Sequence, residues 1–171
     1  MFKNLEDVQT CWRAESAKTL EIFSAIPDQA LKTAITPEHR DLRRLAWHLV
    51  ESVIEMPGHC GLQIAGAHLL QGNFIGDPPA TMKEISDAYA AASASLGEAL
   101  KAWRDEDLSL EDELYGEHWK RGFTLFVLVS HQIHHRGQMT VLMRQAGLKV
   151  PGLYGPVKEG WAAYGMEAPK V

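Results

Sequence analysis

Apolar residues recur at helical spacing in four stretches of the chain, and this periodicity constrains the fold more than any other feature of the sequence. In the first stretch, seven residues spaced alternately three and four positions apart share one face: Leu5, Val8, Trp12, Glu15, Thr19, Ile22 and Ile26. A helix with such a stripe has to bury it against other helices. Two members of the stripe, Glu15 and Thr19, are polar and interrupt it.

The same pattern predicts helices over about residues 5–26, 42–58, 81–103 and 122–145. Residues 59–80 fit no single element, and no stretch shows the alternation of a β-strand. The last 24 residues are rich in glycine and proline, which indicates an irregular tail that Trp161 and Tyr164 could hold against the body. The sequence therefore predicts an all-α fold, a four-helix bundle with an irregular C-terminal tail, as a single domain over residues 1–171.

Charge and cysteine content exclude several classes of protein. A formal net charge of -5 argues against nucleic acid as a partner, and no stretch approaches the roughly 20 apolar residues of a membrane span. Six acidic residues fall within positions 105–113, which predicts a solvated connection. Only two cysteines are present, Cys11 and Cys60, and we expect both to be free thiols in a reducing, cytoplasmic compartment.

Two histidines four residues apart, His131 and His135, follow the apolar run 123–129, which places them on or near a buried helix. Residues at this spacing lie on the same helical face, so both imidazoles can be directed at one point. Burying them without a partner would cost free energy, and neutral imidazole is the commonest metal ligand. The pair predicts a metal site. His134 is rotated by about 100° and is expected beside the site, not in it.

A third ligand has to come from another helix. His48 lies between Leu45 and Leu49 in an apolar helical stretch, and is the best candidate. The other histidines considered precede the helix, follow the Pro-Gly break or lie in a predicted loop: His39, His59 and His118. Three histidines and an exchangeable water would form an open site of the catalytic type, whereas structural zinc is closed by four protein ligands.

These motifs resemble those of the DinB-like superfamily. The resemblance rests on Leu45-Ala-Trp-His48-Leu and on His131-x3-His135-Arg-Gly-Gln138 about 80 residues later, and helix order and length agree over nearly the whole chain. It implies a four-helix bundle of that family's own topology, commonly dimeric, with a divalent metal held by three histidines that match His48, His131 and His135.

The resemblance also implies a range of chemistry. Characterised members include bacillithiol-type thiol S-transferases and a mycothiol-dependent maleylpyruvate isomerase, while many others have no known reaction. Three imidazoles suit zinc, nickel, iron and copper alike. We expect zinc or nickel, with iron or manganese as alternatives, together with a small-molecule substrate, a low-molecular-weight thiol as cosubstrate, and a homodimer.

Two reactions are compatible with such a site. If the metal binds a thiol as thiolate, S-transfer to an electrophilic substrate follows, and if water stays bound, hydrolysis follows. Glu15 or Glu55 could act as general base, since Glu55 lies two turns after His48 on the same face, although the position of Glu55 favours a surface carboxylate over that role. Arg136 and Gln138 are expected to form an ion pair and a helix-to-helix hydrogen bond.

Two other functions are alternatives to the enzyme hypothesis. A metal- or small-ligand-binding bundle without turnover would hold the metal for stability or sensing, and a fourth protein ligand would favour it. A purely structural bundle would leave its histidines without metal.

Overall fold

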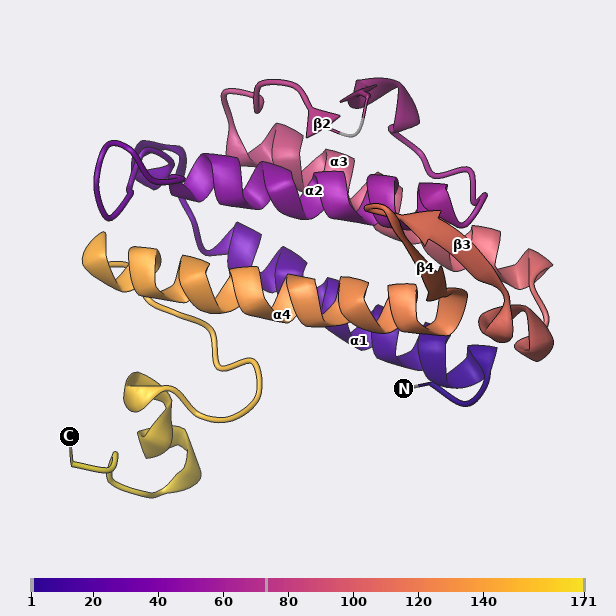
Figure 1. Cartoon of the computed structure of the whole chain (residues 1–171). Coiled ribbons are helices and arrows are strands. Elements are labelled where there is room, and N and C mark those ends of the chain that lie inside the picture. The colour runs from indigo at the N-terminus through magenta and orange to yellow at the C-terminus, as the bar shows by residue number, and fades with distance from the viewer. Residues whose placement is uncertain (1, 73, 171) are drawn as a thin grey trace.

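The computed structural model describes residues 2–72 and 74–170. Its body consists of four long α-helices with nearly aligned axes, shown in Figure 1. They are α1 (Leu5–Ser24), α2 (Leu42–His59), α3 (Met82–Ala99) and α4 (Arg121–Gln145). The predicted helical body is therefore confirmed, with boundaries within about four residues of those expected from the sequence.

Each helix packs against two of the others. Both α1 and α2 pack on α3 and on α4. Figure 1 shows that α2 and α3 run in the same direction, opposite to α1 and α4, so the connection over 60–81 has to cross the length of the bundle. Within the part of the chain that the structure describes, no helix is long and apolar enough to cross a membrane.

Side chains at the helix starts explain the boundaries. The Asn4 side chain accepts a hydrogen bond from the Asp7 backbone amide, and Asp41 accepts one from Arg44 at 2.7 Å. Thr81 forms a reciprocal capping box with Glu84 at the start of α3. Such caps satisfy amide groups that lack a partner within the helix.

The predicted face of α1 is the buried face. Its buried residues are Val8, Trp12, Glu15, Ser16, Thr19, Ile22 and Phe23. Both polar members of the predicted stripe, Glu15 and Thr19, are thus inside the bundle. Burying a carboxylate or a hydroxyl is tolerated only when the group finds hydrogen-bond partners, so these two residues indicate a polar network between the helices.

The prediction that the chain has no strands is wrong in two places. The acidic segment read as a connection forms the short 3-10 helix η4 (Asp105–Ser109) and then β3 (Glu111–Leu114), which pairs with β4 (Glu117–Lys120). Tyr115 and Gly116 form the turn with φ of +53° and +82°. Two successive left-handed residues match the twist of a tight hairpin. The hairpin is also linked to the start of α4, because the Asp112 carboxylate pairs with Arg121 at 2.7 Å.

The remaining segments are short. The connection after α1 contains the 3-10 helix η1 (Asp28–Ala30), and α3 continues into η3 (Leu100–Ala102). Residues 60–81, for which the sequence predicted no element, contain η2 (Ala67–Leu69) and a small hairpin of β1 (Leu70–Gln71) and β2 (Phe74–Ile75).

The C-terminal tail is irregular, as predicted, apart from the 3-10 helix η5 (Lys158–Tyr164). Tyr154 attaches it to the body, since its hydroxyl contacts Glu15 and Arg136 and its ring lies 4.3 Å from the Lys18 Nζ. Tyr164 is 65% exposed, so the prediction that it holds the tail is wrong.

The side-chain amide of Gln132 links all four helices. Its Nε2 donates to the Leu49 carbonyl at 3.1 Å and to Ser52 Oγ at 2.9 Å, both on α2. Its Oε1 accepts from the Tyr89 hydroxyl of α3 at 3.0 Å and, at 3.5 Å, from Thr19 of α1. Gln132 is fully buried, so this network fixes the depth and rotation of α4 in the bundle.

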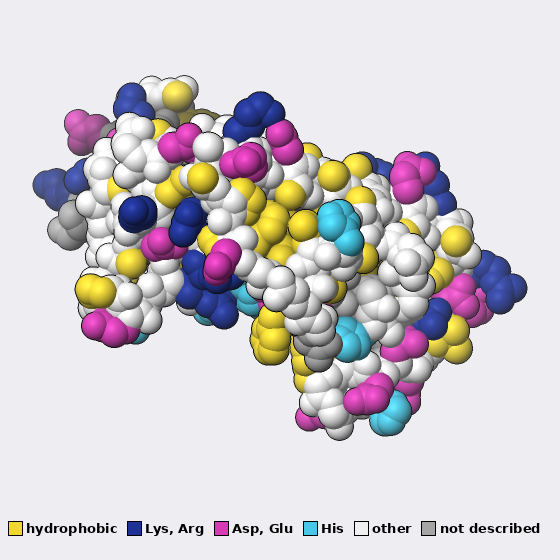
Figure 2. All heavy atoms as spheres, turned by 90° about the horizontal axis from the view of Figure 1, so that it is seen from above, with side chains coloured by type: hydrophobic (Ala, Val, Ile, Leu, Met, Phe, Trp, Pro, Cys, Tyr) yellow, Lys and Arg dark blue, Asp and Glu magenta, His cyan; other side chains and the backbone are white. Residues whose placement is uncertain are grey.

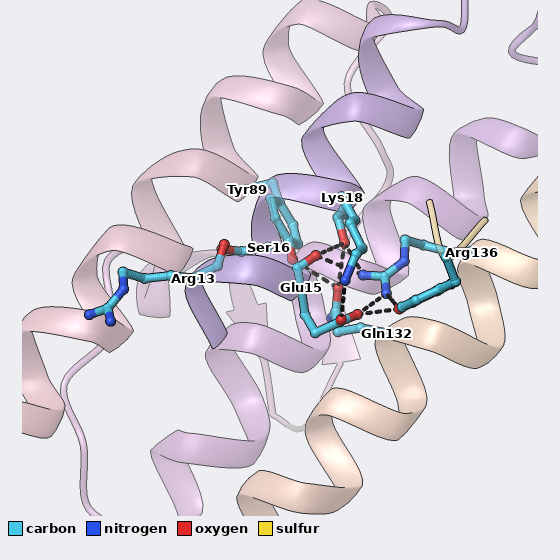
Figure 3. Close-up of polar contacts among 9 residues, drawn as sticks. Arg13, Glu15, Ser16, Lys18, Tyr89, Gln132 and Arg136 are labelled. Atoms are coloured by element: carbon cyan, nitrogen blue, oxygen red, sulfur yellow. Dashed lines mark hydrogen bonds and ion pairs between the residues drawn. The ribbon is translucent and has the colours of Figure 1, made fainter. Parts of the chain in front are cut away.

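A buried ion pair lies beside this amide, as Figure 3 shows. The Arg136 guanidinium, only 1% exposed, pairs with the Glu15 carboxylate and donates to the Glu15 carbonyl at 2.8 Å and to Thr19 Oγ1 at 2.9 Å. Lys18 approaches the other Glu15 oxygen at 2.7 Å. The ion pair predicted for Arg136 is present, and it joins α1 to α4.

We expect Glu15→Gln to reduce the free energy of unfolding by about 3 kcal/mol, because Arg136 would remain buried without its counter-charge. Urea denaturation at pH 7 measures this loss. Glu21→Gln, which neutralises an exposed carboxylate on the same helix, is the matched control and should change stability little. Equal stability of the two variants would show that the ion pair contributes nothing.

The same pair makes stability depend on pH. Burial alone would raise the pKa of Glu15, but hydrogen bonds from Lys18, Tyr154 and Arg136 outweigh it and hold that pKa below its usual range. A lowered folded-state pKa contributes stability that is present above the unfolded pKa of roughly 4.3 and is lost as pH falls through the folded value. The advantage of the wild-type protein over Glu15→Gln should therefore be complete above about pH 4.3 and should decrease progressively as pH falls below that value.

Candidate metal centre

Ring nitrogens of three histidines converge between α2 and α4. The Nε2 atoms of His48 and His131 lie 3.2 Å apart, and those of His131 and His135 lie 3.1 Å apart. The potential ligand atoms of all three residues lie within 4.8 Å of one another. The structure thus brings together the three residues for which the sequence predicted a shared metal.

Helix geometry produces this convergence. His131 and His135 lie one turn apart on α4, and their ring centroids are 4.4 Å apart. His48 comes from the first half of α2, and its ring lies edge-on to both, with centroids 4.9 and 4.8 Å away. Gln132 binds the backbone carbonyl of Leu49, the residue after His48, so its amide sets the height of α4 against α2 at the site.

Two of the three imidazoles have outer partners that orient them. His135 Nδ1 lies 2.7 Å from Gln138 Oε1, a hydrogen-bond acceptor, so Nδ1 carries the proton. His48 Nδ1 faces a carboxylate oxygen of Glu51 at 3.6 Å. In His135 this tautomer leaves the Nε2 lone pair directed toward the centre. Such outer partners fix tautomer and ring orientation at metal sites.

The imidazoles of His131 and His135 are held in their neutral form. Burial, followed by the neighbouring histidines, lowers the pKa of His131 to about 3. Burial also lowers the pKa of His135 to about 4, against the hydrogen bond to Gln138, which acts in the opposite direction. The positive charge of Arg40 lowers both values further. Neutral imidazole is the form that binds metal.

The donor set fits a divalent cation. Three nitrogens bound at about 2.1 Å to one ion are roughly 3.0–3.4 Å apart, a range that includes the Nε2 separations of 3.2 and 3.1 Å at this site. Lone pairs that converge repel one another unless a proton or a cation lies among them. Across the described residues, no carboxylate or thiol joins the three histidines as a fourth potential ligand.

The two carboxylates predicted as general bases lie in different surroundings. Glu15 is engaged by Arg136, Lys18 and Tyr154 in the bundle interior. Glu55 is 7% exposed, not a surface residue, and its oxygens contact His59 Nε2 at 3.0 Å and the Tyr115 hydroxyl at 2.7 Å. Neither belongs to the group of three histidines.

Two residues close in sequence to His135, namely His134 and Gln138, do not belong to the group of three histidines. His134 is exposed, and its Nε2 contacts the Gln138 amide at 3.1 Å, so it lies beside the site as predicted. Gln138 binds within α4, and the predicted helix-to-helix hydrogen bond is wrong. Glu51 was missed by sequence reasoning, although its position three residues after His48 places it on the same face.

A cavity of about 320 Å³ opens next to His135. Its apolar walls come from the α1–α2 connection, from α2 and from the end of α4, and its polar lining comes from the connection and the histidine motif. The lining residues are Ile35, His39, Arg40, Leu45, His135, Gln138, Val141 and Leu142. The candidate metal centre is therefore accessible from a mainly apolar pocket of a size suited to a small molecule.

Comparison with known proteins agrees with this architecture. The chain matches the DinB family over residues 1–170. YrdA of Bacillus subtilis, described as an uncharacterized protein, is 39% identical over 173 residues, and the match covers the whole of both chains.

Two solved structures have a similar fold. A DinB-like protein from Bacillus cereus superposes with a TM-score of 0.82 and 35% identity, covering 90% of this chain and all of the other. The DinB-like protein YjoA from Bacillus subtilis superposes with a TM-score of 0.67 at 15% identity, covering 88% and 99% of the two chains, and supports the fold alone. Taken together with the match over residues 1–170, these findings show that the chain belongs to the DinB family.

Proposed function

We propose that the protein binds a divalent metal ion through His48, His131 and His135 and is a metal-dependent enzyme that acts on a small molecule, by thiol S-transfer or by hydrolysis. The observation that carries this proposal is the convergence of three imidazoles without a fourth protein ligand among the described residues. Three protein ligands leave a position for water or substrate, as in catalytic zinc sites.

The chain's own residues supply orientation and access. Gln138 and Glu51 hold two imidazoles with their Nε2 atoms inward. The apolar pocket beside His135 would bind the substrate and exclude water from one side of the site. A divalent ion held there would act as a Lewis acid that lowers the pKa of a bound water or thiol, which makes either a better nucleophile.

A general base completes the proposed chemistry, and Glu55 and Glu15 stay the candidates. Two observations support Glu55 as the base. It lies on α2, the helix that carries His48, and its buried carboxylate accepts a hydrogen bond from the Tyr115 hydroxyl. Glu15 is bound by three donors in the interior. Loss of turnover with retained metal in Glu55→Gln is the expected result if Glu55 is the base.

Zinc or nickel is the proposed metal, with iron or manganese as alternatives, because imidazole nitrogens are good ligands for zinc and nickel. A low-molecular-weight thiol is the proposed cosubstrate. Cys11 and Cys60 are both free, which supports function in a reducing compartment such as the cytoplasm.

We also propose a homodimer. Phe126 and Ile133 lie two turns apart on one face of α4 and are 43% and 39% exposed, and Phe123 stacks on Phe126 with ring centroids 6.5 Å apart. A second copy of the chain could cover these apolar side chains.

The metal proposal predicts that His131→Ala and His135→Ala lose most bound metal, because two remaining imidazoles bind far more weakly than three. His134→Ala is the matched control on the same helix and should retain it. Elemental analysis after dialysis measures the metal. Differential scanning fluorimetry should show that the ligand variants also lose the rise in Tm that Zn²⁺ or Ni²⁺ gives the wild-type protein. Full metal content in His135→Ala would remove the site.

The enzyme proposal predicts turnover by the metal-loaded protein. A panel of low-molecular-weight thiols is mixed with monobromobimane, and the rate of thioether formation is compared with the rate without protein. A parallel panel of ester substrates tests hydrolysis. We expect at least one rate to rise and to fall back in His131→Ala. Stoichiometric metal without any such rate would favour a non-catalytic metal-binding bundle.

The dimer proposal predicts a mass near 38 kDa in light scattering at micromolar concentration, twice the 19.0 kDa of one chain. Phe126→Glu should shift the protein to a single chain, because a buried unpaired charge opposes association. Wild-type protein of about 19 kDa would show that this face stays free.

A further inference from the structure

The pocket beside the three histidines contains one strong positive charge, that of Arg40. Across residues 2–72 and 74–170, Arg40 forms no ion pair with a carboxylate. In Figure 2, a group of Lys and Arg side chains left of the centre borders partly covered histidine side chains, with an Asp or Glu side chain adjoining the group.

The acidic neighbours of Arg40 in the sequence are engaged elsewhere. Glu38 accepts a hydrogen bond from Thr36 Oγ1 at 2.6 Å, and Asp41 caps the start of α2 through the Arg44 amide. Neither carboxylate neutralises the guanidinium. Arg40 therefore presents an uncompensated fork of donors at the rim of the pocket, a geometry that matches a carboxylate.

We propose that Arg40 binds the carboxylate of a small substrate whose apolar body lies against Ile35, Leu45, Val141 and Leu142, so that its other end approaches His135. The inference deepens the proposed function, since it rests on that function in treating the ligand as a substrate. The volume of about 320 Å³ lies near the lower limit for small-molecule sites, so the ligand is a small acid.

The charge distribution around the site supports this orientation. Glu51 faces His48 on the α2 side, whereas Arg40 lines the pocket on the side of His135. An anionic group entering from the pocket would meet the guanidinium before it reaches the histidines. The apolar side chains that line the same pocket would bind a hydrocarbon segment and would disfavour a fully polar ligand.

The probe for this inference is hexanoate, with hexan-1-ol as the uncharged molecule of the same chain length. Both are titrated into metal-free protein, kept free of metal with EDTA, and binding is measured from the chemical shifts of backbone amides in ¹H–¹⁵N spectra. Metal-free protein keeps this test independent of metal binding and turnover, so failure here can be distinguished from failure of the proposed function.

We expect hexanoate to shift the amides of Ile35, Val141 and Leu142 and to bind at least fivefold more tightly than hexan-1-ol. In Arg40→Gln that preference should disappear, and in Arg40→Lys part of it should return. The matched control is Arg13→Gln, which removes an equal charge from the groove between α1 and α3 and should leave the preference unchanged.

Two results would overturn the inference. Equal affinity for hexanoate in the wild type and in Arg40→Gln would show that the guanidinium does not recognise the carboxylate. Equal loss of affinity in Arg13→Gln would show that only the net charge matters. Variants that retain the wild-type amide spectrum outside the pocket exclude misfolding as the cause of either result.

Discussion

The buried amide of Gln132 is the interaction on which the rest of the structure depends. It is the one described side chain that we find hydrogen-bonded to residues from each of the other three helices. Because an amide has fixed donor and acceptor directions, satisfying all these partners allows few positions of α4. That position brings His131 to within 3.2 Å of His48, so the spacing of the candidate ligands follows from the packing of their neighbours.

The histidine motif on α4 therefore serves two functions on two faces. His131 and His135 face α2, while Gln132 and Arg136, each one residue further along, face the bundle interior and are buried. A rotation of about 100° per residue separates the two pairs. A polar core of this kind is costly unless every group is paired, and the pairs found here span helices that are far apart in sequence. The polar residues that fix the bundle thus also fix the site.

Sequence periodicity predicted the helices and the histidine group because both depend on local spacing. The stripe on α1 was the buried face, and the spacing of four in His131 and His135 ensured a shared direction. The β3–β4 hairpin was missed because its turn, Tyr115-Gly116, lacks the usual Asn-Gly or Asp-Gly. Its acidic residues were interpreted as a solvated connection, so the ion pair between Asp112 and Arg121 was not expected. The Arg136–Glu15 and Gln132 partners were not identifiable, since they join positions more than 40 residues apart.

The same division explains why the metal site was easier to predict than the substrate. The ligands lie on two regular helices, whose geometry is known in advance. The pocket, by contrast, takes part of its wall from the irregular α1–α2 connection, where Ile35 and Arg40 have positions that no periodicity specifies. Glu51 lies on one side of the histidines and Arg40 lines the pocket on the other. The negative charge of Glu51 would favour a bound cation, and the positive charge of Arg40 would attract an anionic substrate. Selectivity for substrate would then depend on the connection, and affinity for metal on the helices.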